Sequence, residues 1–359
     1  MKISIFLGAG ASAAENLPIQ NELFSEYFKK LKKDDFKSDM NMELYKFFKQ
    51  MFNIDIIKDN MEKAEFPTFE EVLGLLDLAE QRREGFRNFG LENLSKRSDS
   101  IRFLRQYIIL LMAKAIHKTE GSNNYHKLLV KNLLKENLLT DTTFISANYD
   151  IHIDNALASL YKKENPIMLD YGVRFTNFNI ENKWVPPKDP LVKLYKIHGS
   201  LNWLYCPVCS SLTLTPYDEG IMKLLSEIEE VKCLECRSLT VPIIVPPTYF
   251  KNMDNVFLST IWNKVESSLR ESDLVVFCGY SFPDADIHIK YMLKRIQTNR
   301  NKPLKFIVFN YHNGKKDESM KREEDRYKRF LGKDVIFTKS SFEDFSTNPM
   351  KFINDVFKD

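Results

Sequence analysis

The chain has 359 residues, of which 43% are hydrophobic and 28% charged, with a formal net charge of +3 and five cysteines. This length and composition are typical of a globular protein with a substantial core, and they exclude wholesale disorder. The small basic excess does not predict nucleic-acid binding, so the basic pairs Lys315-Lys316 and Lys321-Arg322 are interpreted as solvated surface.

The amino-terminal segment has the features of neither a membrane span nor a signal peptide. Its apolar run, Ile3–Leu7, is too short for either, and no apolar run elsewhere is as long as a membrane span. We therefore expect a cytoplasmic protein without membrane contact. In that reducing compartment, paired cysteines indicate a metal site or a redox pair rather than a structural disulfide.

Short apolar runs alternate with amphipathic stretches along the chain. The predicted strands are Ile3–Leu7, Thr143–Ala147, Leu194–Ile197, Val241–Val245, Leu274–Cys278 and Leu304–Phe309. The predicted helices between them are Phe69–Arg82, Ile101–Lys118, Asn155–Lys163, Phe257–Arg270 and Ile287–Arg300. Several of these strands are apolar on both faces, as buried parallel strands are. The alternation predicts an α/β fold with a doubly wound parallel sheet.

Two segments interrupt this alternation within what we interpret as a single domain, 1–359. Residues 35–138 contain no convincing strand and are predicted to form a helical insertion. Residues 206–236 carry four cysteines in a segment too small to fold on its own core. At the carboxyl end, Phe342–Phe357 is predicted to form a helix that packs back on the body.

A glycine turn follows the first predicted strand, in Gly8-Ala9-Gly10-Ala11-Ser12. Glycines allow a phosphate to approach the backbone, and a helix N-terminus supplies free N–H groups. Ser12 would add a hydroxyl. The alternative is a tight strand-to-helix turn, because the third glycine of the dinucleotide fingerprint is absent and no acidic residue clearly ends a second strand.

Polar residues follow two further predicted strands, as Asn148-Tyr149-Asp150 and His198-Gly199-Ser200. Ligands of open α/β sheets bind at the carboxyl ends of strands. An imidazole titrates near neutral pH and takes protons from hydroxyl groups or water, and Gly199 would leave room for a ligand. The structural alternatives are a helix cap for Asn148 and a hydrogen-bonded loop histidine for His198.

Two C-x-x-C motifs are separated by 23 residues, and their cysteines are Cys206, Cys209, Cys233 and Cys236. Four thiolates at this spacing are typical of a tetrahedral, structural zinc site. A redox pair is the alternative. The fifth cysteine, Cys278, lies in an apolar run and is interpreted as a buried core thiol.

The last two strands also end in small or polar residues. Gly279 and Ser281 follow Leu274–Cys278, and Asn310 follows Leu304–Phe309. These residues would line a phosphate, a ribose or an adenine. Ordinary strand-end loops are the alternative.

The sequence resembles the sirtuin family in motifs that occur in the same order, namely GAGAS, SANYD, HGS with the two C-x-x-C pairs directly after it, FCGYS and FIVFN. The resemblance implies a Rossmann-like domain that binds NAD+ as substrate, with an inserted zinc-ribbon module. It assigns the pyrophosphate to Gly8, Ala9, Gly10 and Ser12, the nicotinamide side to Asn148 and Asp150, the catalytic base to His198, and the adenosine half to Gly279, Ser281 and Asn310.

The sequence departs from the protein deacylases of that family at three places. Their Ile-Pro-Asp-Phe-Arg-like segment is replaced by residues 13–19, AAENLPI, and their Phe-Gly-Glu-like stretch by residues 244–250, IVPPTYF. Their Thr-Gln-Asn-Ile-Asp pattern has become Ser146-Ala147-Asn148-Tyr149-Asp150. The NAD-side chemistry is thus kept and the peptide-side features are not, a combination that resembles the bacterial sirtuin-like NAD+ hydrolases of antiphage defence.

This resemblance implies an NAD+ hydrolase that releases nicotinamide and ADP-ribose and depletes NAD+ in abortive infection. It also implies a homo-oligomer gated by assembly, similar to the stand-alone sirtuin subunit encoded beside a HerA-type ATPase. The alternatives are an NAD-dependent protein-lysine deacylase and a non-catalytic sensor that binds NAD or ADP-ribose.

Overall fold

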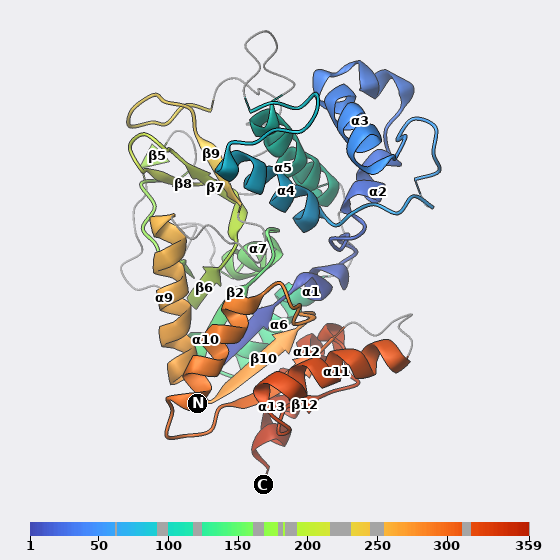
Figure 1. Ribbon diagram of the computed structural model, residues 1–359. Coiled ribbons are helices and arrows are strands. Elements are labelled where there is room, and N and C mark those ends of the chain that lie inside the picture. The colour runs from blue at the N-terminus through green and yellow to red at the C-terminus, as the bar shows by residue number, and fades with distance from the viewer. Residues whose placement is uncertain are drawn as a thin grey trace. The chain divides into compact units, whose positions relative to one another are not determined.

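The computed structural model describes residues 1–61, 63–91, 100–117, 124–160, 169–178, 182–183, 192–215, 231–244, 255–310 and 317–358. The chain forms two compact units (Figure 1). One comprises Met1–Leu17 with Gly121–Asp359, and the other is Pro18–Glu120. These bounds differ from the expected helical insertion at 35–138: the second unit begins at Pro18, and helix α6 (Tyr125–Lys135) belongs to the first.

The first unit is built on a seven-stranded sheet of order β12-β11-β10-β1-β2-β6-β3, in which every described pairing is parallel. Its strands are β1 Ile3–Leu7, β2 Thr142–Ser146, β3 Leu169–Asp170, β6 Val192–Lys196, β10 Leu274–Cys278, β11 Lys305–Phe309 and β12 Ile336–Phe337. Later strands are added on both sides of β1, so the strand order reverses there. The predicted doubly wound α/β fold is confirmed.

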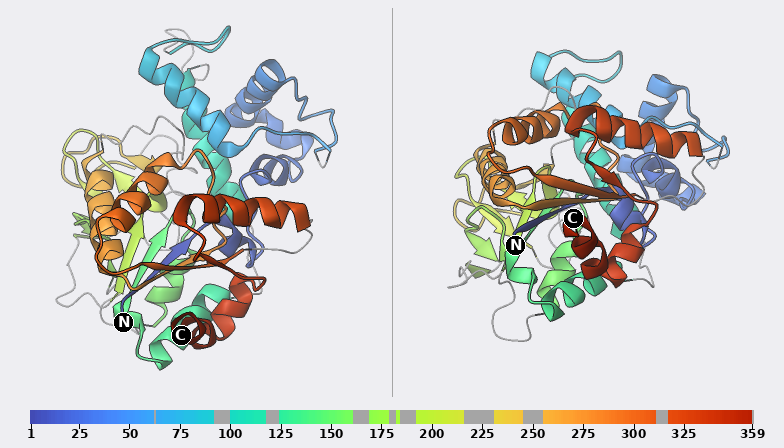
Figure 2. Two further views of the ribbon diagram at one scale, coloured as in Figure 1. Left: turned by 60° about the horizontal axis from the view of Figure 1, so that its bottom comes forward. Right: turned by 90° about the horizontal axis from the view of Figure 1, so that it is seen from below.

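Helices cover both faces of this sheet (Figure 2). One face carries α9 Val256–Glu271, α10 Ile287–Thr298 and α11 Asp317–Leu331. The other carries α6 Tyr125–Lys135, α7 His152–Ala158, α12 Phe342–Thr347 and α13 Pro349–Phe357, while α1 Ala9–Ala13 and the 3₁₀ turn η3 Leu139–Asp141 join strands to helices. Helix α9 shows the cause of this packing, because its apolar residues recur at helical spacing and are buried, as Leu258, Ile261, Val265 and Leu269.

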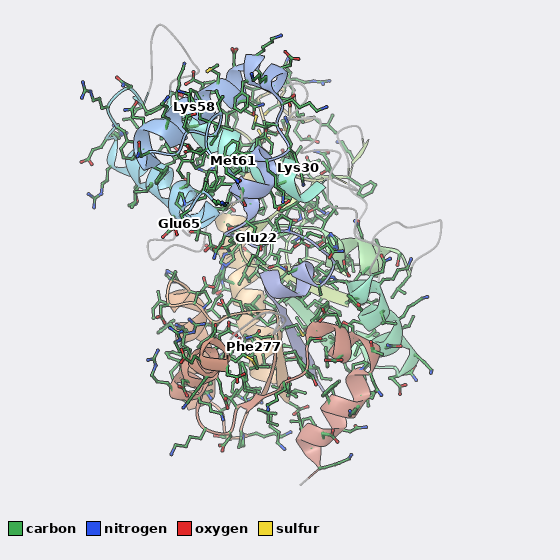
Figure 3. The ribbon with its side chains drawn as sticks, turned by 90° about the vertical axis from the view of Figure 1, so that its right-hand side faces the viewer. Glu22, Lys30, Lys58, Met61, Glu65 and Phe277 are labelled. Carbon is green, nitrogen blue, oxygen red and sulfur yellow. The ribbon has the colours of Figure 1, made fainter. Side chains whose placement is uncertain are left out.

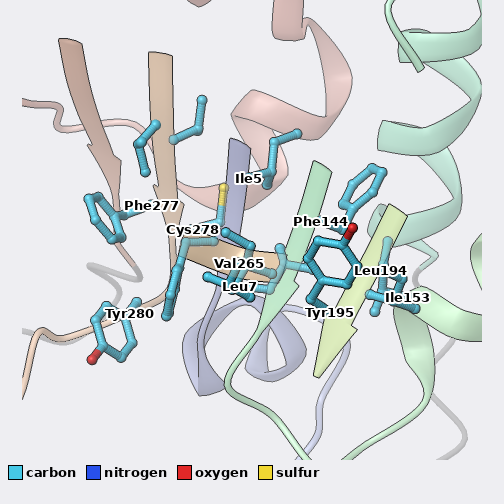
Figure 4. Close-up of a cluster of buried hydrophobic side chains, with 14 of the residues drawn as sticks. Ile5, Leu7, Phe144, Ile153, Leu194, Tyr195, Val265, Phe277, Cys278 and Tyr280 are labelled. Atoms are coloured by element: carbon cyan, nitrogen blue, oxygen red, sulfur yellow. The ribbon is translucent and has the colours of Figure 1, made fainter. Parts of the chain in front are cut away.

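The core lies between the sheet and its helices (Figure 4). Side chains of β1, β2, β6 and β10 meet there, and Ile5, Phe144, Leu194 and Phe277 are fully buried. Both faces of these strands are covered, which explains why their sequences are almost continuously apolar. Cys278 belongs to this core, and burial raises the pKa of its thiol well above the usual range.

A second, five-stranded sheet has the order β5-β4-β8-β7-β9. Its strands are β4 Asn177–Phe178, β5 Asn182–Lys183, β7 Gly199–Tyr205, β8 Leu212–Leu214 and β9 Val241–Ile244. The predicted strand Val241–Val245 was wrongly grouped with the parallel sheet, since β9 pairs antiparallel with β7, and Val245 lies outside the described residues. Pro242 is the local signal of this difference, because proline within a strand is typical of a sheet edge.

The carboxyl-terminal prediction of a single helix at 342–357 is also wrong in one respect. The segment forms two helices, α12 and α13, that separate at Asn348. Pro349 disfavours helical backbone at the residue before it, and Asn348 has φ −145° and ψ 72°. The pair does pack back on the body, where Phe309 of β11 contacts Phe345 and Phe352 with ring centroids 4.7 and 4.9 Å apart.

The described elements of the second unit are helical: α2 Leu23–Phe28, the 3₁₀ helix η1 Lys33–Lys37, α3 Asp39–Phe52, α4 Phe69–Arg82 and α5 Ile101–His117. Phe48 lies at the centre of its aromatic core, with ring centroids 4.8 Å from Phe24 and 5.3 Å from Phe28. In Figure 3 the labels Glu22, Lys30, Lys58, Met61 and Glu65 belong to this unit and Phe277 to the other. Within the described ranges, no helix combines the length and apolarity needed to cross a membrane.

Candidate functional site

The strand register brings the predicted motifs to one edge of the parallel sheet. Leu7 at the end of β1 lies beside Ser146 of β2 and Cys278 of β10. In the same way Ser146 lies beside Lys196, and Cys278 beside Phe309. The residues that follow these strand ends therefore share one edge, and they include Gly8, Ala147, Ile197, Gly279 and Asn310. This is the edge at which open α/β sheets bind ligands.

Asn148, Ser12 and Asp150 form one hydrogen-bonded network at this edge. The Asn148 side-chain nitrogen Nδ2 donates to Ser12 Oγ and to the Gly8 carbonyl oxygen, both at 2.9 Å. Ser12 Oγ in turn donates to Asp150 Oδ2 at 2.7 Å. The three side chains are nearly excluded from solvent, at 9%, 4% and 6% exposure respectively. The network thus joins the first glycine turn to the end of β2.

The surroundings of Asp150 keep its carboxyl group ionised. Burial alone would raise its pKa, but the positive charges of His152 and Lys196 and the Ser12 hydrogen bond hold that pKa below the usual range. Lys196 is fully buried. Its ammonium Nζ donates to the Asp150 backbone oxygen and to Asp154 Oδ2, the latter at 3.1 Å. The buried ammonium of Lys196 therefore lies next to Asp150, one of the predicted catalytic residues.

His198 lies on the neighbouring strand end, almost completely buried at 1% exposure. Its ring centroid is 6.4 Å from that of Tyr149 and 6.5 Å from that of Trp262. The Asp286 carboxylate approaches its Nε2 to 4.0 Å and also accepts a 2.5 Å hydrogen bond from the Tyr280 hydroxyl. An imidazolium formed at His198 would have this carboxylate beside it.

The turn after β1 and the loop after β10 approach each other closely, and glycines on both sides allow this contact. A Cβ on Gly279, which has φ +62°, would lie 2.0 Å from the Ala11 nitrogen, and a Cβ on Gly8 would lie 2.6 Å from the Gly279 oxygen. The amides of Gly8 and Gly10 already donate to the carbonyls of Cys278 and Gly279. In this conformation these two amides are occupied, so a phosphate at this turn would need other donors.

Gly199 also has a structural role. It has φ +85°, and a Cβ there would lie 1.9 Å from the Ile243 carbonyl oxygen of β9. The space beside His198 that the sequence assigned to a ligand is thus filled by backbone. The glycine is required because β7 and β9 pair at this point.

Of the residues assigned to the adenosine half, Gly279 is hydrogen-bonded to the first glycine turn, whereas Asn310 and Ser281 have no described hydrogen bond to the Asn148 network. Asn310 is buried, and its Nδ2 donates to Glu323 Oε2 of α11 at 2.9 Å. Its amide oxygen Oδ1 has no hydrogen-bond partner among the described residues. Ser281, in contrast, is exposed. Among the described residues, Asn310 Oδ1 is thus a buried acceptor without a donor, and Ser281 makes no described hydrogen bond.

The four cysteines of the two C-x-x-C motifs lie together beside the second sheet. Their sulfur atoms all lie within 4.8 Å of one another, with Cys206 to Cys236 at 3.4 Å and Cys209 to Cys233 at 3.5 Å. Zn–S bonds of about 2.3 Å in a tetrahedron place sulfurs about 3.8 Å apart. The donor set and its spacing therefore fit a structural zinc ion, and all four are free of disulfides.

The two motifs have matching backbone geometry. In each, the backbone amide of the first cysteine donates to a serine carbonyl oxygen five residues later, Cys206 to Ser211 and Cys233 to Ser238. The residues after the second cysteines, Ser210 and Arg237, have φ values of 57° and 62°. Hydrogen bonds from Ser238 lower the pKa of Cys236 to about 6, which favours the thiolate that binds metal.

Sequence reasoning missed several polar residues at this edge: Glu15, His126, His152, Asp154, Lys196 and Asp286. Two of them had a local signal. Lys196 lies two residues before His198 at the end of a strand, and Asp154 lies one helical turn after Asp150. Asp286 had none, because only the β10–α10 loop brings it to His198.

The doubly wound sheet with polar strand ends and a four-cysteine cluster defines a sirtuin-like α/β protein. The family model described as the SIR2-like domain matches residues 142–331, more than half of the 359-residue chain. The chain therefore belongs to the SIR2-like domain family. A comparison with curated proteins found no match.

Two solved structures to which the chain is similar are both of Sir2. One, with a p53 peptide and NAD+, is 14% identical, with 99% of this chain and 94% of that chain covered and a TM-score of 0.42. The other, with the inhibitor EX-527, 2′-O-acetyl-ADP-ribose and a deacetylated p53 peptide, is 14% identical, with 98% and 94% covered and a TM-score of 0.41. Similarity at this level carries no argument about activity.

Proposed function

We propose that this chain is an NAD+ hydrolase that releases nicotinamide and ADP-ribose. The observation that carries the proposal is the network of Ser12, Asn148 and Asp150 at the carboxyl edge of the sheet, with His198 on the adjacent strand end. Membership of the SIR2-like domain family supports NAD+ as the substrate. NAD+ would lie along this edge, with its nicotinamide ribose between Asn148 and His198.

Asn148 is suited to orient a water molecule or a ribose hydroxyl. Both described hydrogen bonds of its side chain use Nδ2, so the amide plane is fixed and Oδ1 is the side-chain atom that remains to accept. Asp150 fixes Ser12 from the other side. Such preorganised polar groups stabilise charge as it develops at the ribose without reorganising during the reaction.

In the proposed reaction, the bond between ribose C1′ and the nicotinamide nitrogen breaks, and its electron pair leaves with nicotinamide. A water oxygen then bonds to C1′. His198 takes the proton from that water, directly or through a ribose hydroxyl, and Asp286 stabilises the resulting imidazolium. The products are nicotinamide, ADP-ribose and one proton.

The proposal extends to antiphage defence, with the zinc module as a structural element and a HerA-type ATPase as the gating partner of a homo-oligomer. Its support is the sequence at residues 13–19, where a peptide-side segment of protein deacylases is replaced, while Asn148 and Asp150 of the NAD side are kept. The other replaced peptide-side stretch, 244–250, lies outside the described residues apart from Ile244. A protein-lysine deacylase is the second candidate function, supported by the shared family.

Product chromatography separates these functions. The purified chain is incubated with NAD+, with and without an acetylated-lysine peptide. Nicotinamide and ADP-ribose formed without peptide are the expected result. Acyl-ADP-ribose formed only when peptide is present would contradict the hydrolase and support the deacylase.

A further inference from the structure

A second cluster of metal-ligating side chains lies close to the Asn148 network. Glu15 follows α1, His126 lies in the first turn of α6, and His152 is the first residue of α7. The Glu15 carboxylate meets His126 Nδ1 at 2.9 Å through Oε1 and His152 Nδ1 through Oε2. It also accepts the His126 backbone amide at 2.8 Å. Three elements of the first unit thus converge on one buried carboxylate.

The donor set is one that transition metals prefer. One carboxylate oxygen and two imidazole nitrogens all lie within 4.8 Å of one another. Zinc binds such ligands at about 2.0–2.2 Å, which places them about 3.3 Å apart in a tetrahedron. Glu15 and His126 are fixed, at 4% and 3% side-chain exposure, whereas His152 is 25% exposed. His152 therefore has room to adjust, and its side is the one from which an ion and a water ligand can enter.

The local charge also favours a dication. The His152 amide donates to Asp150 Oδ1 at 3.0 Å, so the cluster is continuous with the Asp150 carboxylate. Asp154 lies beyond it, paired with Lys196 at 3.1 Å. These contacts join three buried carboxylates and one ammonium, a net charge of −2 once the imidazoles are neutral, as metal ligands must be, so a divalent ion would replace the positive charge that imidazolium rings supply without metal. Burying uncompensated charge is costly, and a divalent ion bound to Glu15 would balance it.

We propose that Glu15, His126 and His152 bind a divalent transition-metal ion of the zinc class, at a site separate from the four cysteines. The ion would tie the segment after the first glycine turn to the start of α7, two residues past Asp150. This inference does not rest on NAD+ hydrolysis. The competing interpretation is that Glu15 only accepts hydrogen bonds from two imidazolium rings, without metal.

Metal content and cobalt spectroscopy of the full chain distinguish these interpretations. The proposal predicts two zinc equivalents per chain, of which one is lost in His152→Ala and in Glu15→Gln but kept in His288→Ala, a matched variant on α10. Loss of one ligand should weaken this site at least tenfold, roughly as for other metal-site substitutions. NAD+ cleavage is not the readout, so failure here would leave the proposed function untouched.

Cobalt(II) identifies the ligands without relying on the folding of any variant. Thiolate ligands give intense charge-transfer absorption in the near ultraviolet, whereas nitrogen and oxygen ligands give only weak visible bands. In the unsubstituted chain, a second cobalt equivalent that adds weak visible bands and no further thiolate absorption is expected. A single bound equivalent with thiolate absorption alone would overturn the proposal.

Discussion

The side-chain amide of Asn148 donates a 2.9 Å hydrogen bond to the hydroxyl of Ser12, a residue 136 positions earlier in the chain. This bond crosses from the end of β2 to the turn after β1. The Ser12 hydroxyl in turn donates a 2.7 Å hydrogen bond to the Asp150 carboxylate. The orientation of the proposed catalytic amide therefore depends on the first glycine turn, which in turn depends on the loop after β10.

His198→Ala should reduce NAD+ cleavage by roughly 10²- to 10⁴-fold, the range typical of a lost general base. Asp286→Asn should give a smaller loss, because it removes only the carboxylate 4.0 Å from Nε2. The measurement is the rate of nicotinamide release, with binding of NAD+ followed by calorimetry. Unchanged turnover in His198→Ala would contradict the assigned base, and His288→Ala is the matched control.

Gly279→Ala should destabilise the fold by several degrees in Tm. The added Cβ would lie 2.0 Å from the Ala11 nitrogen, and overpacking of this kind costs about 1–3 kcal/mol in addition to the strain of positive φ. Gly332→Ala is the control, since it also has positive φ but no atom within 4 Å of the new Cβ. Equal Tm values for the two variants would show that the loops do not interlock as described.

Lys196→Met should lower the free energy of unfolding by about 3–5 kcal/mol, because it leaves the Asp154 carboxylate buried without its cation. The double variant with Asp154→Asn should recover part of this loss, since the amide can still accept from Tyr171. Denaturant unfolding measures both. If the loss in the double variant equals the sum of the losses in the two single variants, Lys196 and Asp154 are not a coupled buried pair.

Cys206→Ser should remove one zinc equivalent per chain and lower Tm, because three remaining thiolates no longer close the tetrahedral site. Cys278→Ala should keep that zinc, as Cys278 lies in the core of the parallel sheet. Metal content by mass spectrometry is the readout. Full zinc content in Cys206→Ser would contradict a four-cysteine site.

Much of the fold was predictable from the sequence, because the apolar runs form buried strands and the amphipathic stretches form helices that pack on one face. The strands Ile3–Leu7 and Leu274–Cys278 and the helix Phe69–Arg82 have the predicted bounds. The second sheet was not predictable, because strands of two or three residues such as β4 and β8 carry no periodicity.

Part of the candidate site was likewise predictable from the sequence and part was not. Asn148, Asp150 and His198 follow strands and so could be placed at one edge from sequence alone. The polar residues around them could not, since Glu15, His126 and Asp286 reach the edge only through helix and loop packing. The glycines were recognised as necessary, but the atoms they make room for are backbone atoms of neighbouring loops.

Nicotinamide release by Asn148→Ala, compared with the unsubstituted chain and with Asn299→Ala on the exposed end of α10, tests the central claim most directly. All three proteins should remain folded by circular dichroism. The account predicts a loss of roughly 100-fold or more in Asn148→Ala, comparable to the loss of a preorganised polar group in other active sites, and none in Asn299→Ala. Full NAD+ cleavage by folded Asn148→Ala would contradict it.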